Sequence, residues 1–246
     1  MRAPSALEMV ELWDNAIDRK PHARLTGLVE AMYGPEARGD TLGMRNRRLV
    51  EMHQRLFAAD MEAVMTCAAC DSVIEFVAPT AQILAIPPPE TLEATVIVKG
   101  RPQRYRLPVM RDLEAVAAEC DPADAARRLL ERCRCDGEGG EEPDAATVEF
   151  ISGAFESLDA AAVLTMDCVC SECGAQQSGR FEVASFLVRD VERAVNALVR
   201  DVDQLARAYG WSERAILELP SRRRRRYVEM ITASASNGSS QFRALR

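Results

Sequence analysis

Two short cysteine motifs, far apart in the chain, constrain the fold more than any other feature of the sequence. The first is Cys67-Ala-Ala-Cys70 and the second is Cys170-Ser-Glu-Cys173. Two Cys-x-x-Cys pairs supply four thiolates, which is the ligand set of a closed tetrahedral zinc site. We therefore predict that Cys67, Cys70, Cys170 and Cys173 bind one structural Zn²⁺ ion, with Cys168 as an alternative to Cys170.

Strand-like segments flank both motifs, as in a zinc ribbon. The expected strands are residues 62–66, 72–77, 162–167 and 178–183. Each motif also needs a tight turn after its second cysteine. Gly174 forms such a turn without steric cost, and Asp71 tolerates the left-handed conformation. Each half is thus predicted to consist of a strand, a knuckle and a second strand.

A disulfide framework, a redox pair and unliganded thiols fit the cysteine pattern less well than a zinc site does. Disulfide frameworks are typical of secreted proteins, and nothing marks this chain as secreted. A thioredoxin-like redox pair would open a helix, whereas a strand pattern follows Cys70. Because a long segment separates Cys70 from Cys170, the two halves of a ribbon must meet through the fold.

The remaining sequence predicts a mostly helical α+β protein built around this split ribbon. Its parts are N-terminal helices over 1–58, the split zinc ribbon over 59–77 and 162–183, an inserted small α/β lobe over 78–161, C-terminal helices over 184–233 and a disordered tail over 234–246. The lobe contains a predicted hairpin over 94–98 and 103–107. Cys120, Cys133 and Cys135 are expected to be small apolar residues there, the alternative being a second metal site.

Helical periodicity and end signals define the helices more closely. The expected long helices are 6–18, 23–33, 42–57, 145–157 and 184–209. Thr41 and Asp121 are typical N-cap residues, and Gly34 and Gly210 are typical of helix ends. Two short C-terminal helices should follow, the last of them from Ser221 to about residue 233. We expect them to fold back on the 184–209 helix or to offer apolar surface to a partner.

Arg222 to Arg226 form a run of five arginines in a chain whose net charge is −7. Five consecutive residues spread around a whole helical turn and form no single stripe. Aromatic residues for base stacking are nearly absent, since only Tyr227 is close. We expect a solvated or salt-bridged helix face. The alternative is a nucleic-acid-binding zinc-ribbon protein that uses Arg222–Arg226.

The sequence favours a non-enzymatic protein without a small-molecule substrate. It has no nucleophile–histidine pair at an interpretable spacing and no Gly-rich phosphate loop. The only histidines, His22 and His53, lie away from the knuckles. No apolar run approaches the roughly 20 residues of a membrane span. Eight unpaired-looking cysteines predict a reducing compartment, hence the cytoplasm.

The C-terminal third carries the most specific signature of the sequence. It runs from Tyr209-Gly-Trp-Ser-Glu213 through Ile216-Leu217-Glu-Leu219 to Ser221-Arg-Arg-Arg-Arg-Arg-Tyr227. Matching features upstream are the long helix, the Cys-x-x-Cys-Gly knuckle with Phe181-Glu-Val183, Cys67-x-x-Cys70 leading into Glu75-Phe76, and Tyr105-Arg-Leu-Pro108 followed by Asp112-Leu113. Over most of residues 45–232 the chain resembles the baseplate hub assembly chaperone family of T-even-type contractile phages and related injection systems.

This resemblance implies a non-enzymatic assembly factor that helps to build the hub of a contractile tail baseplate. It also implies partners among the hub and spike proteins of that tail. We therefore expect a cytoplasmic assembly chaperone that is stabilised by a structural zinc ion, binds no membrane and is unlikely to bind nucleic acid.

Overall fold

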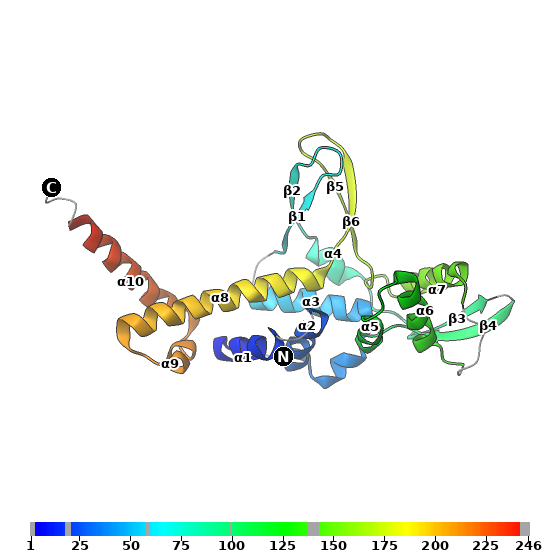
Figure 1. Cartoon of the computed structure of the whole chain (residues 1–246), viewed down its shortest axis with the longest axis horizontal. Coiled ribbons are helices and arrows are strands. Elements are labelled where there is room, and N and C mark those ends of the chain that lie inside the picture. Colours follow the sequence, from blue (N-terminus) through cyan, green and yellow to red (C-terminus); the bar gives the residue numbers. More distant parts are fainter. Residues whose placement is uncertain (1–2, 18–20, 58–59, 99, 137–142, 242–246) are drawn as a thin grey trace. The chain divides into compact units, whose positions relative to one another are not determined.

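The computed structural model describes residues 3–17, 21–57, 60–98, 100–136 and 143–241, which form a mostly helical α+β protein (Figure 1). The expected fold class is therefore confirmed. The helices are α1 (Ala6–Ile17), α2 (Pro21–Tyr33), the 3-10 helix η1 (Pro35–Gly39), α3 (Leu42–Phe57), α4 (Thr80–Ala85), α5 (Met110–Val116), α6 (Pro122–Cys133), α7 (Ala145–Leu158), α8 (Val183–Tyr209), α9 (Glu213–Leu217) and α10 (Ser221–Gln241). The strands are β1 (Glu62–Thr66), β2 (Val73–Val77), β3 (Glu93–Val98), β4 (Arg101–Arg106), β5 (Thr165–Val169) and β6 (Gln176–Arg180).

The predicted cap residues begin and end helices in the structure. The Thr41 hydroxyl accepts a hydrogen bond from the Met44 N–H at 3.3 Å in the first turn of α3. The Asp121 carboxylate accepts from the first-turn amides of α6. Gly34 and Gly210 follow α2 and α8 with φ of 92° and 68°, a region that only glycine enters without steric cost.

Two short helices and the bounds of the two strands in the second hairpin differ from the sequence prediction. The prediction did not include η1 and α4, and α4 begins directly after Pro79. In the second hairpin, β5 and β6 lie closer to their knuckle than expected, so Cys168 belongs to β5. The reason is that cross-strand pairing continues up to the knuckle, ending at Val169 and Gln176.

The last helix corrects the prediction of a disordered tail that starts at residue 234. α10 continues to Gln241, and residues 242–246 lie outside the described residues. Adding one residue to an existing helix gains a hydrogen bond for each residue fixed, whereas starting a helix is costly. The segment 234–241 contains no proline and only one glycine, Gly238.

The chain forms two compact units. One joins residues 1–28 with 188–246, and the other comprises residues 29–187. The expected N-terminal part, 1–58, is therefore divided, because α1 contacts α9 in the first unit while α3 contacts α4 in the second. None of the described helices is long and apolar enough to span a bilayer.

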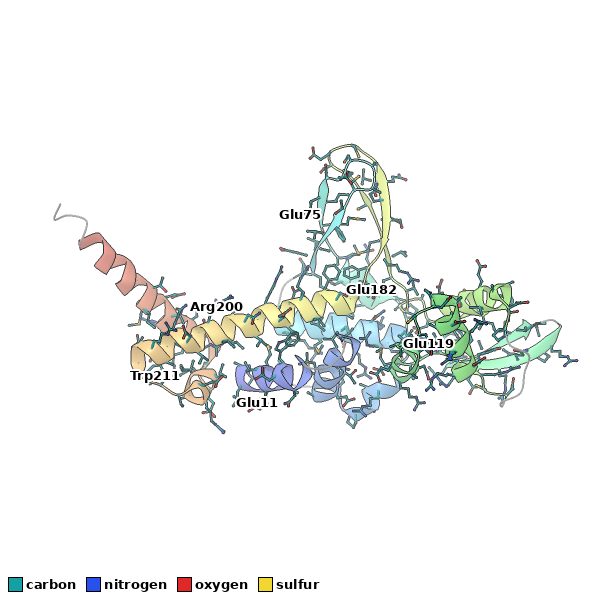
Figure 2. All side chains as sticks on the ribbon, in the orientation of Figure 1. Glu11, Glu75, Glu119, Glu182, Arg200 and Trp211 are labelled. Carbon is teal, nitrogen blue, oxygen red and sulfur yellow. The ribbon has the colours of Figure 1, made fainter. Side chains whose placement is uncertain are left out.

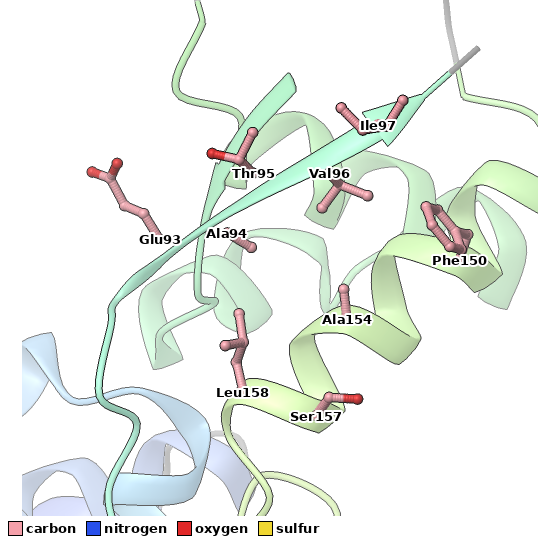
Figure 3. Close-up of a pocket in the computed structure, with 9 residues that line it drawn as sticks. All are labelled: Glu93, Ala94, Thr95, Val96, Ile97, Phe150, Ala154, Ser157 and Leu158. Atoms are coloured by element: carbon pink, nitrogen blue, oxygen red, sulfur yellow. The ribbon is translucent and has the colours of Figure 1, made fainter. Parts of the chain in front are cut away.

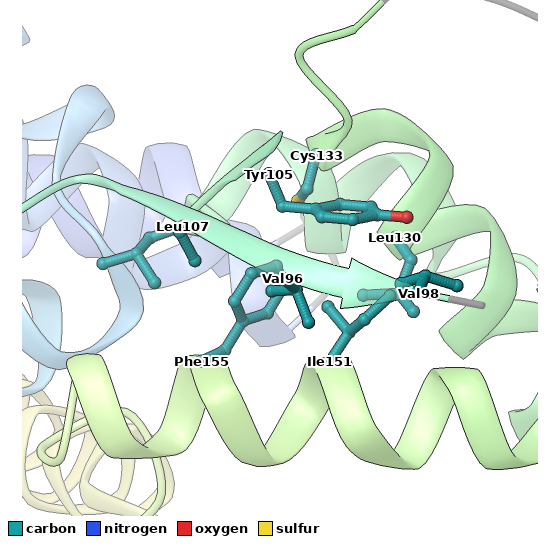
Figure 4. Packing of buried hydrophobic residues seen from close by; sticks show 9 residues of the cluster. Val96, Val98, Tyr105, Leu107, Leu130, Cys133, Ile151 and Phe155 are labelled. Atoms are coloured by element: carbon teal, nitrogen blue, oxygen red, sulfur yellow. The ribbon is translucent and has the colours of Figure 1, made fainter. Parts of the chain in front are cut away.

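The inserted lobe in the second unit has its own hydrophobic core (Figure 4). The β3–β4 hairpin packs one face against α6 and α7, which places the Tyr105 ring edge-on to Phe155 with centroids 6.3 Å apart. Cys133 is fully buried in this core, and burial raises the pKa of its thiol to about 12. It therefore packs as a small apolar residue, as predicted, whereas Cys120 is exposed and Cys135 half-buried.

A buried carboxylate joins three segments of the lobe. Asp112, in α5, has no exposed side-chain surface and accepts two hydrogen bonds from Arg106 of β4, at 2.6 and 2.8 Å. It also accepts from the Val109 N–H at 3.0 Å and lies 3.4 Å from the Arg132 guanidinium in α6. These bonds satisfy both carboxylate oxygens, so the buried charge is compensated.

A second buried carboxylate caps α3 from a distant part of the sequence. Asp159, directly after α7, accepts a hydrogen bond from the Gly43 N–H at 2.8 Å. The amide of Asn46 donates to the backbone carbonyls of Ala161 and Ala162 at 2.9 and 3.2 Å. The start of α3 is thus fixed to the segment that leads into β5, the first strand of the second knuckle.

In the first unit, the C-terminal helices bury apolar residues, as the fold-back prediction requires. Ile216 and Leu217 of α9 are almost completely buried. Arg224 of α10 is also buried and pairs with Asp201 of α8 at 3.1 Å. The prediction of a salt-bridged arginine run holds for Arg224, while the other four arginines of the run are exposed.

Candidate metal centre

The two cysteine motifs are built by equivalent backbone hydrogen bonds. In the first knuckle, the Cys67 N–H donates to Ser72 and the Asp71 N–H donates to Cys67, both at 2.9 Å. The second knuckle has the same two bonds, from Cys170 to the Ala175 carbonyl and from Gly174 to the Cys170 carbonyl, again at 2.9 Å. Each knuckle is therefore a rigid turn that orients two cysteines in the same way.

A left-handed residue closes each of these turns, as the sequence predicted. Asp71 has a φ of 58° and Gly174 a φ of 73°. Asp71 is the only residue other than glycine with positive φ among the described residues. Aspartate is one of the few side chains tolerated in this conformation.

The two hairpins are related position by position by a shift of 103 residues, the separation of Met65 from Cys168. β1 pairs with β2 from Glu62↔Val77 to Thr66↔Val73, and β5 pairs with β6 from Thr165↔Arg180 to Val169↔Gln176. Both hairpins end in a knuckle, and the knuckles lie together at the same end of the hairpins (Figure 1). The chain thus builds one local structure twice.

The four predicted cysteines come together at this end. The Cys67 and Cys173 sulfurs are 3.7 Å apart, and so are those of Cys70 and Cys170. Under the 103-residue shift, Cys67 corresponds to Cys170 and Cys70 corresponds to Cys173. The Cys67–Cys173 contact is therefore equivalent to the Cys170–Cys70 contact, so the hairpins meet with approximate two-fold symmetry. All four sulfurs lie within 4.8 Å of one another and are able to hold a metal ion.

Burial of the sulfurs follows the same symmetry. The first cysteine of each knuckle is buried, with Cys67 at 0% and Cys170 at 1% exposure, whereas Cys70 and Cys173 are exposed. The buried pair packs with Ile74, and Met65, Cys168 and Ala175 surround it. The cluster therefore has one side in a small apolar core and the other side at the surface. Figure 2 shows the side chains of the two hairpins, with Glu75 of β2 labelled.

Cys168 is not part of the sulfur cluster. Its sulfur lies 3.0 Å from the Met65 sulfur, which occupies the equivalent position in the first hairpin. The alternative in which Cys168 replaces Cys170 is therefore not supported, because the group that can hold a metal contains Cys170. The reason is the register of β5: Cys168 pairs with Gln177 within the strand, two residues before the knuckle.

Hydrogen bonds prepare one of the thiols for deprotonation. The hydroxyl and the backbone of Ser72 lower the pKa of Cys70 to about 6. The Ala175 backbone likewise lowers the pKa of Cys173, but the other thiols and burial outweigh it and raise this pKa to about 12. The cluster thus gives up a first proton more easily than a later one, because hydrogen bonds from Cys173 to the other thiols and burial both oppose its deprotonation. A bound cation removes that obstacle.

The residues that support the cluster were not predicted from the sequence. Besides Ser72, the Gln177 side chain accepts a hydrogen bond from the Ala68 N–H at 3.1 Å and so links the two knuckles. The Ala69 N–H donates to the Cys67 sulfur at 3.4 Å. Ser72 could have been found from its place after the first knuckle, but no sequence signal points to Gln177.

Other candidate residues lie outside this centre. Among the described residues, no second group of metal-ligating side chains is found. His53 is buried in α3, with its ring 5.0 Å from that of Phe57, and the side chain of His22 lies outside the described residues.

No family model, curated protein or solved structure matches the chain.

Proposed function

We propose that Cys67, Cys70, Cys170 and Cys173 bind one structural Zn²⁺ ion. The supporting observation is the separation of the sulfurs. A tetrahedral site with Zn–S bonds of about 2.3 Å has sulfurs about 3.8 Å apart, close to the 3.7 Å of the two cross-hairpin pairs. Four cysteine ligands leave no open position for water, so the proposed ion is structural and not catalytic.

Metal analysis of the purified protein tests this assignment, because tetrahedral sulfur sites also suit iron. We expect one zinc per chain in the wild type and none in a Cys67→Ser, Cys173→Ser double variant. Cys120→Ser removes an exposed cysteine outside the cluster and serves as the control, which should retain its zinc. Stoichiometric iron with visible absorbance, or full zinc content in the double variant, would refute the proposal.

We further propose that the protein is a non-enzymatic assembly factor in the cytoplasm for the baseplate hub of a contractile phage tail or a related injection system. The signature that resembles the hub chaperone family supports this role, because its aromatic residues form one cluster. Tyr209 stacks on Trp211 with ring centroids 4.8 Å apart, and Tyr227 packs edge-on against both at 5.8 and 5.1 Å. Trp211 lies in the turn between α8 and α9 (Figure 2).

The arginine run lies directly before Tyr227 of this aromatic cluster in the sequence and favours a partner with an acidic surface. Four arginines of the run are exposed and form no ion pair with any described residue: Arg222, Arg223, Arg225 and Arg226. Trp, Tyr and Arg are the side chains that most often dominate binding energy at protein interfaces. Arginine also opposes the dipole at a helix start, so acidic groups on a hub or spike protein would relieve an unfavourable charge arrangement.

Co-purification with the hub and spike proteins of the same tail tests this role. The informative variant changes these four exposed arginines to serine and leaves the buried Arg224 in place. We expect this variant to lose the hub protein, whereas the control Arg207→Ser, which changes an exposed arginine of α8, should retain it. Full binding by the fourfold variant would refute the proposed surface. Salt-sensitive binding of DNA without binding of tail proteins would instead favour the nucleic-acid alternative.

A further inference from the structure

The cysteine cluster pairs accessible sulfurs with buried ones. Cys70 and Cys173 are exposed, whereas Cys67 and Cys170 are buried. The Cys70 sulfur lies 3.7 Å from that of Cys170, and the Cys173 sulfur lies 3.7 Å from that of Cys67. Each of these contacts joins the two knuckles, and each contains one sulfur that a dissolved oxidant can reach and one that is shielded from it.

Both contacts are short enough for a disulfide to form without rearrangement of the hairpins. All eight cysteines of the chain are free in this structure. The paired sulfurs must approach from 3.7 Å to about 2.05 Å, which rotation of the two side chains can supply. The other pairing between the knuckles is less favourable, because it would join the two buried sulfurs of Cys67 and Cys170.

The fold also favours disulfides between the knuckles over disulfides within them. Only two residues separate the cysteines of each knuckle, whereas a link between the knuckles closes a loop on the order of 100 residues. In an unfolded chain the longer loop is the costlier one to close. The folded chain has already met this cost, because the Ala68 N–H donates to the Gln177 side chain and the four sulfurs lie within 4.8 Å of one another.

The thiols of the lobe are arranged differently from those of the cluster. Cys133 is fully buried in the lobe core, and the Cys135 sulfur donates to the Cys133 carbonyl at 3.8 Å. A groove of about 490 Å³ lies between β3 and α7, but none of its lining residues is a cysteine, so it exposes no thiol (Figure 3). An oxidant therefore meets closely paired thiols at the cluster and not in this groove.

We propose that hydrogen peroxide converts the metal-free cluster into two disulfides that join the hairpins, Cys70–Cys170 and Cys67–Cys173. Each exposed thiol first takes one oxygen atom from peroxide, so that the O–O bond breaks and a sulfenic acid and water form. The buried partner then attacks this sulfur. The S–S bond forms, the S–O bond breaks, and hydroxide leaves with the thiol proton as a second water. Each disulfide thus gives up two electrons, which reduce one peroxide molecule.

This modification site depends neither on the proposed zinc ion nor on the proposed role in baseplate assembly, because it uses thiols that hold no metal. It gives the ribbon a second means of joining its two hairpins when metal is lost under oxidising conditions. A thiol reductant reverses the link. Reversible disulfides of this kind are the ones that occur in reducing compartments, where they are transient or redox-sensing.

The test oxidises the full chain with hydrogen peroxide after treatment with a chelator and identifies the disulfides by mass spectrometry. Cleavage after glutamate places Cys67 and Cys70 in peptide 63–75, Cys170 in peptide 157–172 and Cys173 in peptide 173–182. We expect peptide 63–75 to be joined to both other peptides, and fragmentation between Cys67 and Cys70 assigns the partners. Oxidation in urea should instead favour disulfides within each knuckle by at least about tenfold.

Cys168→Ser is the matched control, because Cys168 shares peptide 157–172 with Cys170 but its sulfur contacts that of Met65. This variant should give the same cross-linked peptides as the wild type. Disulfides within the knuckles of the folded chain would overturn the inference, as would loss of the cross-link in Cys168→Ser. So would a cluster that stays reduced under conditions that oxidise the exposed Cys120.

Hydrogen exchange provides a second measurement on the wild type. In the presence of chelator, the oxidised chain should keep β1, β2, β5 and β6 protected, because the disulfides still join the hairpins. Dithiothreitol should then remove this protection. Equal exchange of the oxidised and reduced chains in chelator would show that the disulfides do not hold the ribbon together.

Discussion

At the scale of single residues, a few side chains fix positions that the surrounding elements could not fix alone. Asp112 balances two arginines in the interior of the lobe, and Asp71 accepts a left-handed conformation so that its knuckle can close. In both cases, a single substitution tests what the side chain contributes to stability.

Asp112→Asn should destabilise the protein by about 1.5–3 kcal/mol at neutral pH, because it replaces charged hydrogen bonds between a buried carboxylate and the partly exposed Arg106 guanidinium. Burial acts to raise the pKa of Asp112, but the hydrogen bonds from Arg106 and Val109 outweigh it, so the net pKa is lowered. A lowered carboxyl pKa stabilises the fold above the unfolded-state pKa of about 3.9. That contribution is lost as the pH falls through the still lower folded-state pKa.

Urea unfolding of wild type and Asp112→Asn at neutral and acidic pH measures this effect. The difference in unfolding free energy should be large near neutrality and shrink once the pH falls below the unfolded-state pKa. Asp124→Asn removes a half-exposed carboxylate from an ion pair of α6 and should cost less than about 1 kcal/mol. Equal losses in the two variants would contradict the structural role of Asp112.

Asp71 provides a test of backbone conformation. Asp71→Gly should melt at or above the wild-type temperature, whereas Asp71→Ala should lose about 1–2 kcal/mol, because only the latter has a side chain that is strained at positive φ. Thermal melting of the purified proteins in the presence of Zn²⁺ measures the difference. If alanine and glycine behave alike, the left-handed turn is not what this position contributes.

At the scale of elements, one buried ion pair joins α10 to α8 within an otherwise exposed run of arginines. Arg224 is 6% exposed and contacts Asp201 as well as the Leu219 carbonyl. The neighbouring Arg225 is exposed on the same helix turn. The run therefore combines one structural position with four that are free to contact a partner.

Arg224→Ala should destabilise the C-terminal helices by about 1–3 kcal/mol, because it removes a buried side chain and its charged hydrogen bond to the partly exposed Asp201 carboxylate. Arg225→Ala should change stability by less than about 0.5 kcal/mol. Hydrogen exchange in α8 and α10 distinguishes the two variants, since only the first should show faster exchange there. Equal exchange would mean that this ion pair does not hold α10 on α8.

At the scale of the whole molecule, the candidate metal centre belongs to the unit of residues 29–187 and not to the unit that contains α9 and α10. Its four sulfurs join two hairpins that are otherwise separate two-stranded sheets. Small sheets of this kind are marginal by themselves. The cluster is thus expected to stabilise the ribbon far more than the C-terminal helices.

If the proposed metal is bound, its removal by a chelator should increase hydrogen exchange in β1, β2, β5 and β6 and leave hydrogen exchange in α9 and α10 unchanged. Structural zinc in small motifs contributes roughly 10–16 kcal/mol of apparent binding free energy. Only part of this should appear in the free energy of unfolding here, because the hydrophobic cores also stabilise the fold. Acid should have the same effect as the chelator, because the ligands must be deprotonated to bind metal. Uniform loosening of both units would contradict this division.

The sequence by itself determined the elements that depend on local rules. Helix periodicity, the cap residues Thr41 and Asp121, and the hairpin of the lobe depend on neighbouring residues, so the patterns predicted them closely. The four cysteines were also found from spacing alone, because each knuckle is a local turn.

The tertiary structure decided everything that depends on long-range contacts. It excluded Cys168 from the sulfur cluster, placed Gln177 across from Ala68 and joined Asp159 to the start of α3. No sequence pattern encodes such contacts, because they depend on how separate elements pack.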